Sequence, residues 1–385
     1  MAKATAGHNW PAVAKPQKGT YMLEKHVQFS QSPAMKASAG ESPSVVLAIR
    51  SMILGFALLP VCSLAQISVP MVGVGNSGNA ADTTGYGSVS YIYNIGTYEV
   101  LNSQYAAFLS AVATTADTYN LYNANMATDA RGGIIQSGSP GSYTYMVKSA
   151  YANMPVVYVS FFDGLRFANW MQNGQPTGAQ GIGTTETGTY TFTGETAVGG
   201  RNPLSIFYAV ATENEWYKAA YYDPTLNTGS GGYWLYPTRS SSIPNSRTPP
   251  NATDPNSANF SRDDGIANGY NGGFAVTQSS VFNNGVNYLS NGGAYGLAGS
   301  FYGTFDQGGN VFEWSETGAG SGILRGGSWD QLETRMRATS RLAATLGFEN
   351  YNVGFRLAYI PEPSALTLIG AGWLLLFARQ RVARR

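Results

Sequence analysis

Residues 66–360 of this 385-residue chain contain neither cysteine nor histidine. The single cysteine, Cys62, and both histidines, His8 and His26, precede this region. Without these residue types a fold has no disulfide, no structural zinc site, no His-ligated iron and no Ser-His-Asp or Cys-His catalytic system. We therefore expect residues 66–360 to be held together by a hydrophobic core or by bound ions.

The first 65 residues divide into two parts. Residues 1–44 are polar and show no apolar periodicity, as in a disordered extension or a start codon assigned too early. Residues 45–65 contain Arg50, an apolar run and a small-residue site that ends at Ala65. This order predicts a signal peptide cleaved after Ala65. A buried core helix is the alternative interpretation of the apolar run.

Residues 360–385 carry a second hydrophobic segment. The motif Pro361-Glu362-Pro363 precedes an apolar stretch, 365–378, that is short for a membrane span, and arginines follow it. This order resembles the PEP-CTERM sorting signal of Gram-negative bacteria. The resemblance implies a short transmembrane helix before cleavage, processing by an exosortase, and delivery to the cell surface or extracellular matrix. A plain membrane anchor is the alternative.

Amino-acid composition indicates the fold class of the region between these two segments. Only 12% of the chain is charged, while glycine (47) and tyrosine (25) are abundant, which favours a loop-rich α+β or β-rich domain. Residues 66–360 hold 13 Lys and Arg against 19 Asp and Glu, a net charge of −6, although the whole chain carries +1. No basic footprint for nucleic acid remains, so we expect no nucleic-acid partner.

Regular elements are predicted mainly in the first half of this region. Residues 66–96 favour short strands joined by Gly and Asn turns. The stretch "NSQYAAFLSAVATT" predicts a helix that Asn102 can cap. Residues 223–322, by contrast, are rich in Gly, Asn, Ser and Pro, and such a long irregular stretch needs a function or bound ions to order it.

Two further helices carry capping signatures. In "SFFDGLRFANWMQNG", Ser160 and Asp163 match a capping box and Gly174 can end the helix. In "TENEWYKAAYYD", Thr212 and Glu215 match the same pattern. Both helices are therefore expected to begin at these caps.

Six short stretches occur in a characteristic order: "NIGTYEVLNSQYAAFL", "MPVVYVSFFDGLRFANWM", "YAVATENEWYKAAYY", "GGNVFEW", "LRGGSW" and "NVGFRLA". Together they resemble the formylglycine-generating enzyme (sulfatase-modifying factor) family across nearly all of residues 66–359, and especially its exported PEP-CTERM branch. The resemblance implies an α+β fold, the family's variant of the C-type-lectin-like fold, with little regular secondary structure.

The chain departs from this family at the position of its chemistry. The namesake enzymes oxidise a substrate cysteine with two cysteines that hold copper, just after a Gly-Gly-Ser-aromatic stretch. After Ser328-Trp329 this chain continues with Asp330 and Gln331 and has no thiol. Thiolates supply both the soft ligands for Cu(I) and the redox partner. We therefore expect no copper and no formylglycine-generating activity.

Other charged and aromatic residues leave alternatives open. The arginines near the Gly-Gly-Ser-Trp stretch can form structural ion pairs with Glu215, Glu313 and Asp330, or can line an anion pocket. Paired glutamates such as Glu213/Glu215 and Glu313/Glu316 resemble a glycosidase acid/base pair only weakly. The tryptophans can pack in the core or line a glycan cleft.

The resemblance also implies two structural Ca²⁺ sites. Calcium takes six to eight oxygen ligands from carboxylates, amides and backbone carbonyls. The alternative is that Asn310 and Glu313 only hydrogen-bond backbone and arginine. The first site would use Asn259, the Phe260 carbonyl, Asp264 and the Ile266 carbonyl, and the second would use Glu313, Asn310 and the carbonyls of Gly309 and Val311.

Two functions are compatible with the sequence. The first is a calcium-stabilised binding or structural module, exported to the surface or matrix, whose ligand is an extracellular polysaccharide or a surface protein. The second is an oxidoreductase-like enzyme of the same family with an undefined carboxylate, Tyr and Arg site. The lack of His and Cys favours the first.

Overall fold

The computed structural model describes residues 66–202 and 207–361. The chain divides into a unit of Met1–Val61 and a unit of Cys62–Arg385, and the described residues belong to the second. The predicted extension and signal peptide, and the sorting segment after Pro361, lie outside the described residues. Within the described ranges, no helix has the length and apolar character needed to cross a membrane.

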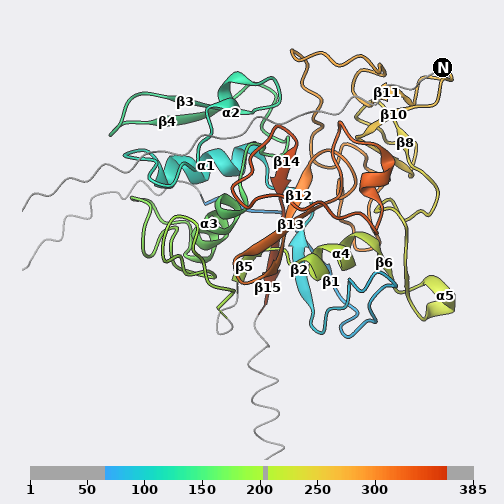
Figure 1. Cartoon of the computed structure of the whole chain (residues 1–385), viewed down its shortest axis with the longest axis horizontal. Coiled ribbons are helices and arrows are strands. Elements are labelled where there is room, and N and C mark those ends of the chain that lie inside the picture. The colour runs from blue at the N-terminus through green and yellow to red at the C-terminus, as the bar shows by residue number, and fades with distance from the viewer. Residues whose placement is uncertain (1–65, 203–206, 362–385) are drawn as a thin grey trace, which may run out of the picture. The chain divides into compact units, whose positions relative to one another are not determined.

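A four-stranded antiparallel sheet joins distant parts of the chain (Figure 1). Ala358 lies opposite Ile95 on one side and Ala209 on the other, so the last strand of the domain fills the middle of the sheet. The strand order is β1 (Met71–Val74), β2 (Tyr93–Gly96), β15 (Leu357–Ile360) and β5 (Phe207–Val210).

A second sheet lies at the centre of the domain and has the order β13-β12-β14. Strand β12 (Phe312–Gly318) pairs antiparallel with β13 (Ser321–Arg325) and parallel with β14 (Val353–Phe355). Only Arg356 separates β14 from β15. The side chain of Arg356 is therefore positioned where the two sheets meet.

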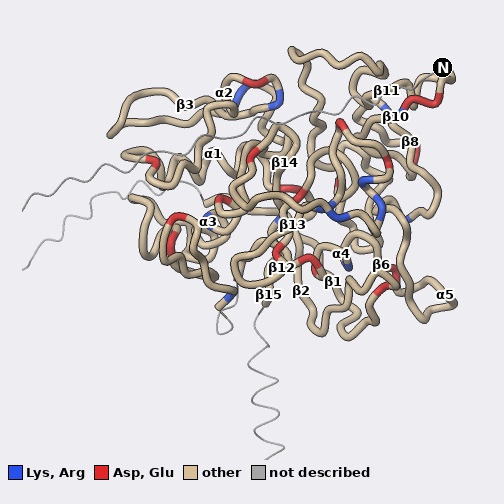
Figure 2. Tube along the Cα trace, viewed as in Figure 1, with Lys and Arg blue, Asp and Glu red and all other residues tan. Residues whose placement is uncertain are grey.

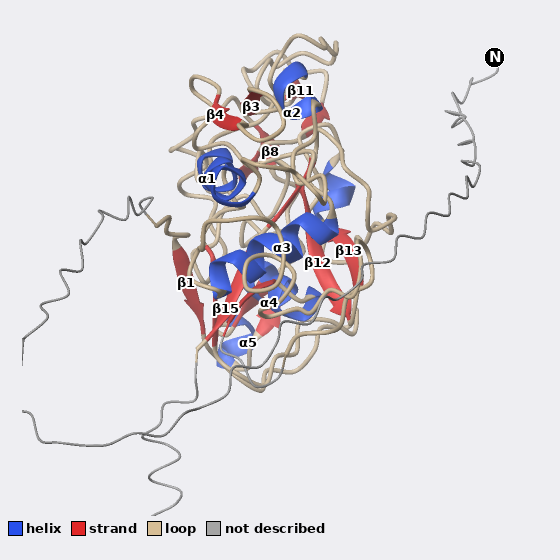
Figure 3. Ribbon diagram, turned by 90° about the vertical axis from the view of Figure 1, so that its left-hand side faces the viewer, coloured by secondary structure: helices blue, strands red, loops and turns tan. Residues whose placement is uncertain are grey.

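Within the described ranges, three helices have nine or more residues: α1 (Asn102–Val112), α3 (Phe161–Gln172) and α4 (Glu213–Tyr221). Helices α3 and α4 pack against these sheets, and α1 packs against α3. Figure 3 shows α3 and α4 beside the strands, and α4 contacts both β2 and β12. The capping boxes predicted at Ser160 and at Thr212 are confirmed. Gly174 follows the end of α3 with φ of 82°.

The predicted cap of α1 is wrong. Leu101 is the N-cap residue, and Asn102 is the first residue inside the helix. The Asn102 amide instead donates hydrogen bonds to the carbonyls of Tyr151, Met154 and Pro155. The Asn102 side chain thus binds carbonyls about 50 residues further along the chain instead of capping its own helix.

The remaining elements are short and are separated by long loops. The predicted α+β fold with little regular secondary structure is therefore confirmed. These elements are α2 (Asn125–Thr128), α5 (Leu226–Gly229), the 3-10 turn η1 (Glu333–Met336), and the strand pairs β3 (Ile134–Ser137) with β4 (Thr144–Val147), β6 (Tyr222–Asp223) with β7 (Gly232–Tyr233), β8 (Asn245–Ser246) with β9 (Ser257–Ala258), and β10 (Ser261–Asp263) with β11 (Gly272–Phe274).

Aromatic residues fill the core between α1, α3 and β14. The ring of Phe167 lies 5.4 Å from Phe108 and 5.5 Å from Phe355, with edge-to-face geometry in both pairs. Among the described residues, core packing is confirmed for the buried Trp170, Trp216, Trp314 and Trp329, whereas Trp234 is only partly buried. Figure 2 shows that charged residues are sparse along the trace.

Candidate functional site

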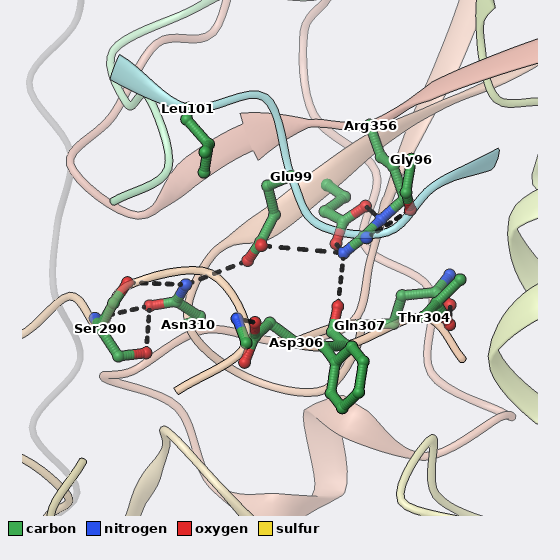
Figure 4. Close-up of polar contacts among 12 residues, drawn as sticks. Gly96, Glu99, Leu101, Ser290, Thr304, Asp306, Gln307, Asn310 and Arg356 are labelled. Carbon is green, nitrogen blue, oxygen red and sulfur yellow. Dashed lines mark hydrogen bonds and ion pairs between the residues drawn. The ribbon is translucent and has the colours of Figure 1, made fainter. Parts of the chain in front are cut away.

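A buried acidic cluster lies where the two sheets meet (Figure 4). Glu99 follows β2, Asp306 precedes β12, Glu313 is the second residue of β12, and Arg356 lies between β14 and β15. Glu99, Glu313 and Arg356 are almost fully buried, and Asp306 is partly buried. Three carboxylates therefore surround one guanidinium in the interior of the domain.

Arg356 is held mainly by Glu313. Its Nε and Nη2 donate to the two oxygens of the Glu313 carboxylate at 2.9 and 2.7 Å. Trp216 Nε1 donates to the same carboxylate at 2.7 Å. Arg356 also donates to the carbonyls of Gly96 and Phe305. This bidentate pair neutralises Glu313, and together with the two carbonyls it leaves few N–H donors of Arg356 for the other carboxylates.

Glu99 has no such partner. Its Oε2 atom lies 3.8 Å from Arg356 Nη2, and within the described residues no hydrogen bond reaches this buried oxygen. Burial raises the pKa of Glu99 well above its ordinary range, and the nearby carboxylate of Asp306 raises it further. Burial also raises the pKa of Asp306 to about 6. The cluster thus has more negative charge than Arg356 can compensate.

Asn310 links this cluster to Asn259. Asn310 Nδ2 donates to Glu99 Oε1 at 3.1 Å, while Asn310 Oδ1 accepts from Asn259 Nδ2 at 3.1 Å and from Ser290 N at 3.0 Å. Asn259 Oδ1 is buried and is not hydrogen-bonded within the described residues. The structure therefore joins two amides that the sequence placed in separate calcium sites.

The remaining residues of the first predicted site lie in other networks. The Phe260 carbonyl accepts hydrogen bonds from Ser246 Oγ and Ala275 N. Asp264 accepts from Ile266 N and from an asparagine amide near the β10–β11 turn, and Ile266 is 61% exposed. These bonds do not bring Asp264 and Ile266 to Asn259, and the four-residue site stays a prediction.

The second predicted site is more compact. Gly309 and Val311 flank Asn310, and all three residues are buried. Gly309 has φ of 84°, and a Cβ there would lie 2.2 Å from the Asn259 carbonyl oxygen, so this position requires glycine. The tight turn holds the carbonyls of Gly309 and Val311 in the segment that carries Glu313.

The oxygen donors of this cluster fit a hard cation such as Ca²⁺. A carboxylate has about four lone-pair sites, and the three donors on Glu313 leave one at Oε1. Glu99 Oε2 is an orphaned carboxylate oxygen beside it. In the described ranges, however, no group of three or more Asp, Glu, His or Cys side chains is placed so that it could hold a metal ion, so carbonyl and amide oxygens would have to complete any such site.

Sequence reasoning missed Glu99 and Asp306. Asp306 precedes Glu313 by only seven residues, and this closeness to the "GGNVFEW" motif is the signal that could have drawn attention to it. Glu99 lies more than 200 residues from Glu313, and nothing in its local sequence marks it as a partner.

The segment after the Gly-Gly-Ser-Trp stretch forms an aromatic and polar scaffold. Trp329 stacks on Tyr288, with ring centroids 4.5 Å apart and planes at 5°. Asp330 accepts hydrogen bonds from Ser328 Oγ at 2.6 Å and from Asn352 Nδ2 at 3.1 Å. Asp330 is therefore satisfied by neutral donors and is not the arginine partner that the sequence suggested.

The other arginines find partners different from those expected. Arg325 and Arg341 both bind Glu213, and Glu215 is bound by Arg201. Structural ion pairing is thus confirmed as a class, while the individual pairings with Glu215 and Asp330 are wrong. Both arginines pair with Glu213 because its buried carboxylate lies between their two guanidinium groups.

A family model described as "Sulfatase-modifying factor enzyme 1-like domain" matches residues 88–360. Three solved structures are similar at 15–17% identity, and a search of curated proteins finds no significant match. The crystal structure of CarF has a TM-score of 0.45 and covers 77% of this chain and 99% of its own. Treponema denticola variable protein 1 has a TM-score of 0.39 and covers 76% and 95%, and PvdO from Pseudomonas aeruginosa has 0.37 and covers 76% and 92%.

The family match spans well over half of the chain. It includes the helix α4, the acidic cluster and every strand of the two sheets except β1. The chain therefore belongs to the sulfatase-modifying factor, or formylglycine-generating enzyme, family.

Proposed function

We propose that this protein is a non-catalytic binding or structural module of the formylglycine-generating family. The observation that carries this proposal is the stretch after Ser328-Trp329, where the family resemblance implies the copper-binding thiols. Asp330 there is occupied by hydrogen bonds within the protein, and residues 66–360 contain no Cys or His. The soft ligands and redox partner of the namesake reaction are therefore missing from this region.

Calcium is the proposed stabiliser of the module. The residues that would hold it are those of the second predicted site, Glu313, Asn310 and the carbonyls of Gly309 and Val311, with Glu99 as an additional carboxylate. The support is the excess of buried carboxylate over guanidinium and the orphaned oxygen Glu99 Oε2. A cation there would compensate the buried negative charge, and binding only to the folded chain would stabilise it.

The site at Asn259 and Asp264 has weaker support. The buried, unpartnered Asn259 Oδ1 is compatible with a ligand role, but it lies in the Asn310 network. We therefore place the proposed ion at the acidic cluster and treat Asn259 as a residue that orients Asn310.

Export is the proposed setting of the module. Its support is sequence order alone: the signal-peptide pattern at 45–65 and the Pro-Glu-Pro motif, apolar stretch and basic tail at 360–385. The partner would be an exosortase that removes the tail. The protein would then reside at the cell surface or in the extracellular matrix, where an ordered domain without disulfides benefits from bound calcium.

A peptide oxidation assay tests the non-catalytic role. The purified protein is incubated with a peptide that carries a sulfatase-type cysteine motif, with and without added copper, and mass spectrometry follows the cysteine. We expect no conversion to formylglycine above the no-protein control. Conversion above that control would support the oxidoreductase alternative and overturn the proposal.

A further inference from the structure

A cavity of about 400 Å³ lies beside the start of α4, apart from the acidic cluster. Its walls are three segments: residues 86–91 before β2, the first turn of α4 from Thr212 to Asn214, and the end of β12 from Glu316 to Gly318. Its volume is within the range of small-molecule sites, about 300–1,000 Å³. The proposed function assigns no role to this cavity.

Hydrogen bonds between the walls hold the cavity in shape. The Gly87 amide donates to Asn214 Oδ1 at 3.0 Å, which ties residues 86–91 to α4. Thr212 and Glu316 form a parallel bridge, and Glu316 N donates to the Ala211 carbonyl at 2.9 Å. A ligand would therefore enter a largely preformed site, which lowers the entropic cost of binding.

Charges around the cavity are balanced. On one side, Glu213 accepts from Arg325 Nε at 2.8 Å and from Arg341 at 2.6 and 2.9 Å. On the other side, Arg201 donates to both Glu215 and Glu316. Glu213 and Glu316, the two charged residues that line the cavity, are thus both neutralised by arginines outside its wall, so no unpaired charge there would select a phosphate, a uronic acid or a polyamine.

Several polar groups of the wall remain without hydrogen bonds among the residues the structure describes. Glu316 Oε2 accepts from Arg201 and Tyr190, but no described group reaches its Oε1 atom. The Asn214 amide nitrogen and the hydroxyls of Ser90 and Thr317 are likewise available as donors or acceptors. Glu316 is only 5% exposed, but its Oε1 is not among the buried oxygens that lack a partner, so this oxygen is open to solvent and can accept an incoming hydroxyl.

Tyr91 adds an aromatic surface. Its hydroxyl donates to Glu215 Oε1 at 2.7 Å, which fixes the ring, yet the side chain is 39% exposed. A fixed, half-exposed ring can stack on the C–H face of a sugar, while hydroxyl groups of the sugar bond both acceptors and donors. Aliphatic ligands are disfavoured, since Val89 is the one aliphatic side chain of any size among the lining residues.

We propose that this cavity binds a short, uncharged saccharide. Glu316 Oε1 would accept a sugar hydroxyl, the Asn214 amide would donate to another, and Tyr91 would support the ring. This inference rests on the proposed function, because it names a ligand class for the binding module.

Isothermal titration of the purified full-length protein tests it. The probes are neutral hexose and N-acetylhexosamine oligosaccharides and matched uronic-acid oligosaccharides. We expect saturable binding of at least one neutral probe. Tyr91→Ala should weaken the Kd roughly three- to tenfold, as expected for the loss of one aromatic contact. Thr317→Trp, at an exposed position of the wall, should block binding.

Ile92→Ala is the matched control, because Ile92 is 59% exposed, next to Tyr91, and outside the cavity wall. Its Kd should equal that of the wild type. The inference is overturned if folded protein binds no neutral probe, prefers uronic acids, or binds equally well in Thr317→Trp. Those results would leave the non-catalytic role standing, whereas peptide oxidation would refute that role without reference to the cavity.

Discussion

Replacing Glu99 by glutamine separates a calcium ligand from an ordinary buried ion pair. Glu99 Oε2 is buried without a hydrogen bond among the described residues, at 3.8 Å from Arg356. In EGTA, Glu99→Gln should therefore stabilise the protein by about 1–3 kcal/mol, because it removes a carboxyl whose pKa burial raises, and each pKa unit corresponds to about 1.4 kcal/mol. Millimolar Ca²⁺ should stabilise the wild type by about 2.7 kcal/mol at a hundredfold excess over Kd, and the variant by much less.

Glu313→Gln would be a poorer test. Glu313 forms a bidentate pair with Arg356, and breaking a buried pair costs about 3–5 kcal/mol whether or not calcium is bound. Glu186→Gln provides the matched control, because Glu186 is buried and paired with Arg166 away from the cluster. It should lower stability equally with and without calcium.

Thermal unfolding in EGTA and in millimolar Ca²⁺ measures these effects. For a domain of nearly 300 residues, 2.7 kcal/mol corresponds to a rise in Tm of roughly 4–5 °C. A wild-type Tm that does not respond to calcium would refute the proposed ion. A full calcium response in Glu99→Gln would show that Glu99 is not a ligand.

Three further predictions follow from single features. Gly309→Ala should lower the free energy of unfolding in urea by roughly 2–4 kcal/mol, because Gly309 has φ of 84° and a Cβ there would lie 2.2 Å from a carbonyl oxygen. Gly347→Ala is the control and should be near neutral, because the space around Gly347 is open. Burial lowers the pKa of Lys218 to about 8, so the unfolded chain binds more protons above that pH and stability should rise from pH 8 toward 9.5. Lys218→Met should remove this slope, and an unchanged slope would contradict it. Intact-mass analysis from the native host should show a chain that begins at Gln66 and lacks the tail, and a mass that includes Arg385 would rule out exosortase processing.

Helix starts are predictable where the signal is local. The capping boxes of Ser160 with Asp163 and of Thr212 with Glu215 each involve residues three apart, and both are present. Asn102 is an equally suitable cap by residue type, but its amide is used by carbonyls 49–53 residues away. A local motif therefore predicts a cap only when no distant group competes for the same side chain.

The sequence predicts that arginines form ion pairs with carboxylates, but it does not predict which carboxylate each arginine binds. Three arginines near the Gly-Gly-Ser-Trp stretch do form ion pairs, but Arg325 and Arg341 share Glu213 and Arg356 binds Glu313, while Glu215 belongs to Arg201. In the same way, the motif around Glu313 predicts a ligand, whereas no motif marks Glu99 beside it. Glu99 and Glu313 are more than 200 residues apart, and Glu213 is more than 100 residues from Arg325 and from Arg341. The tertiary contacts that bring them together leave no spacing rule in the sequence.

The missing residue types follow from the sequence alone, because composition does not depend on folding: residues 66–360 have no thiol and no imidazole. The family and its α+β class follow from short motifs in a characteristic order. The position of each buried charge, by contrast, is decided by tertiary structure. Arg356 reaches Glu313 because β14 pairs with β12, and it approaches Glu99 because β15 pairs with β2. Burial then makes every uncompensated carboxylate costly, and that energetic imbalance, which only the folded arrangement creates, is the support for the proposed calcium ion.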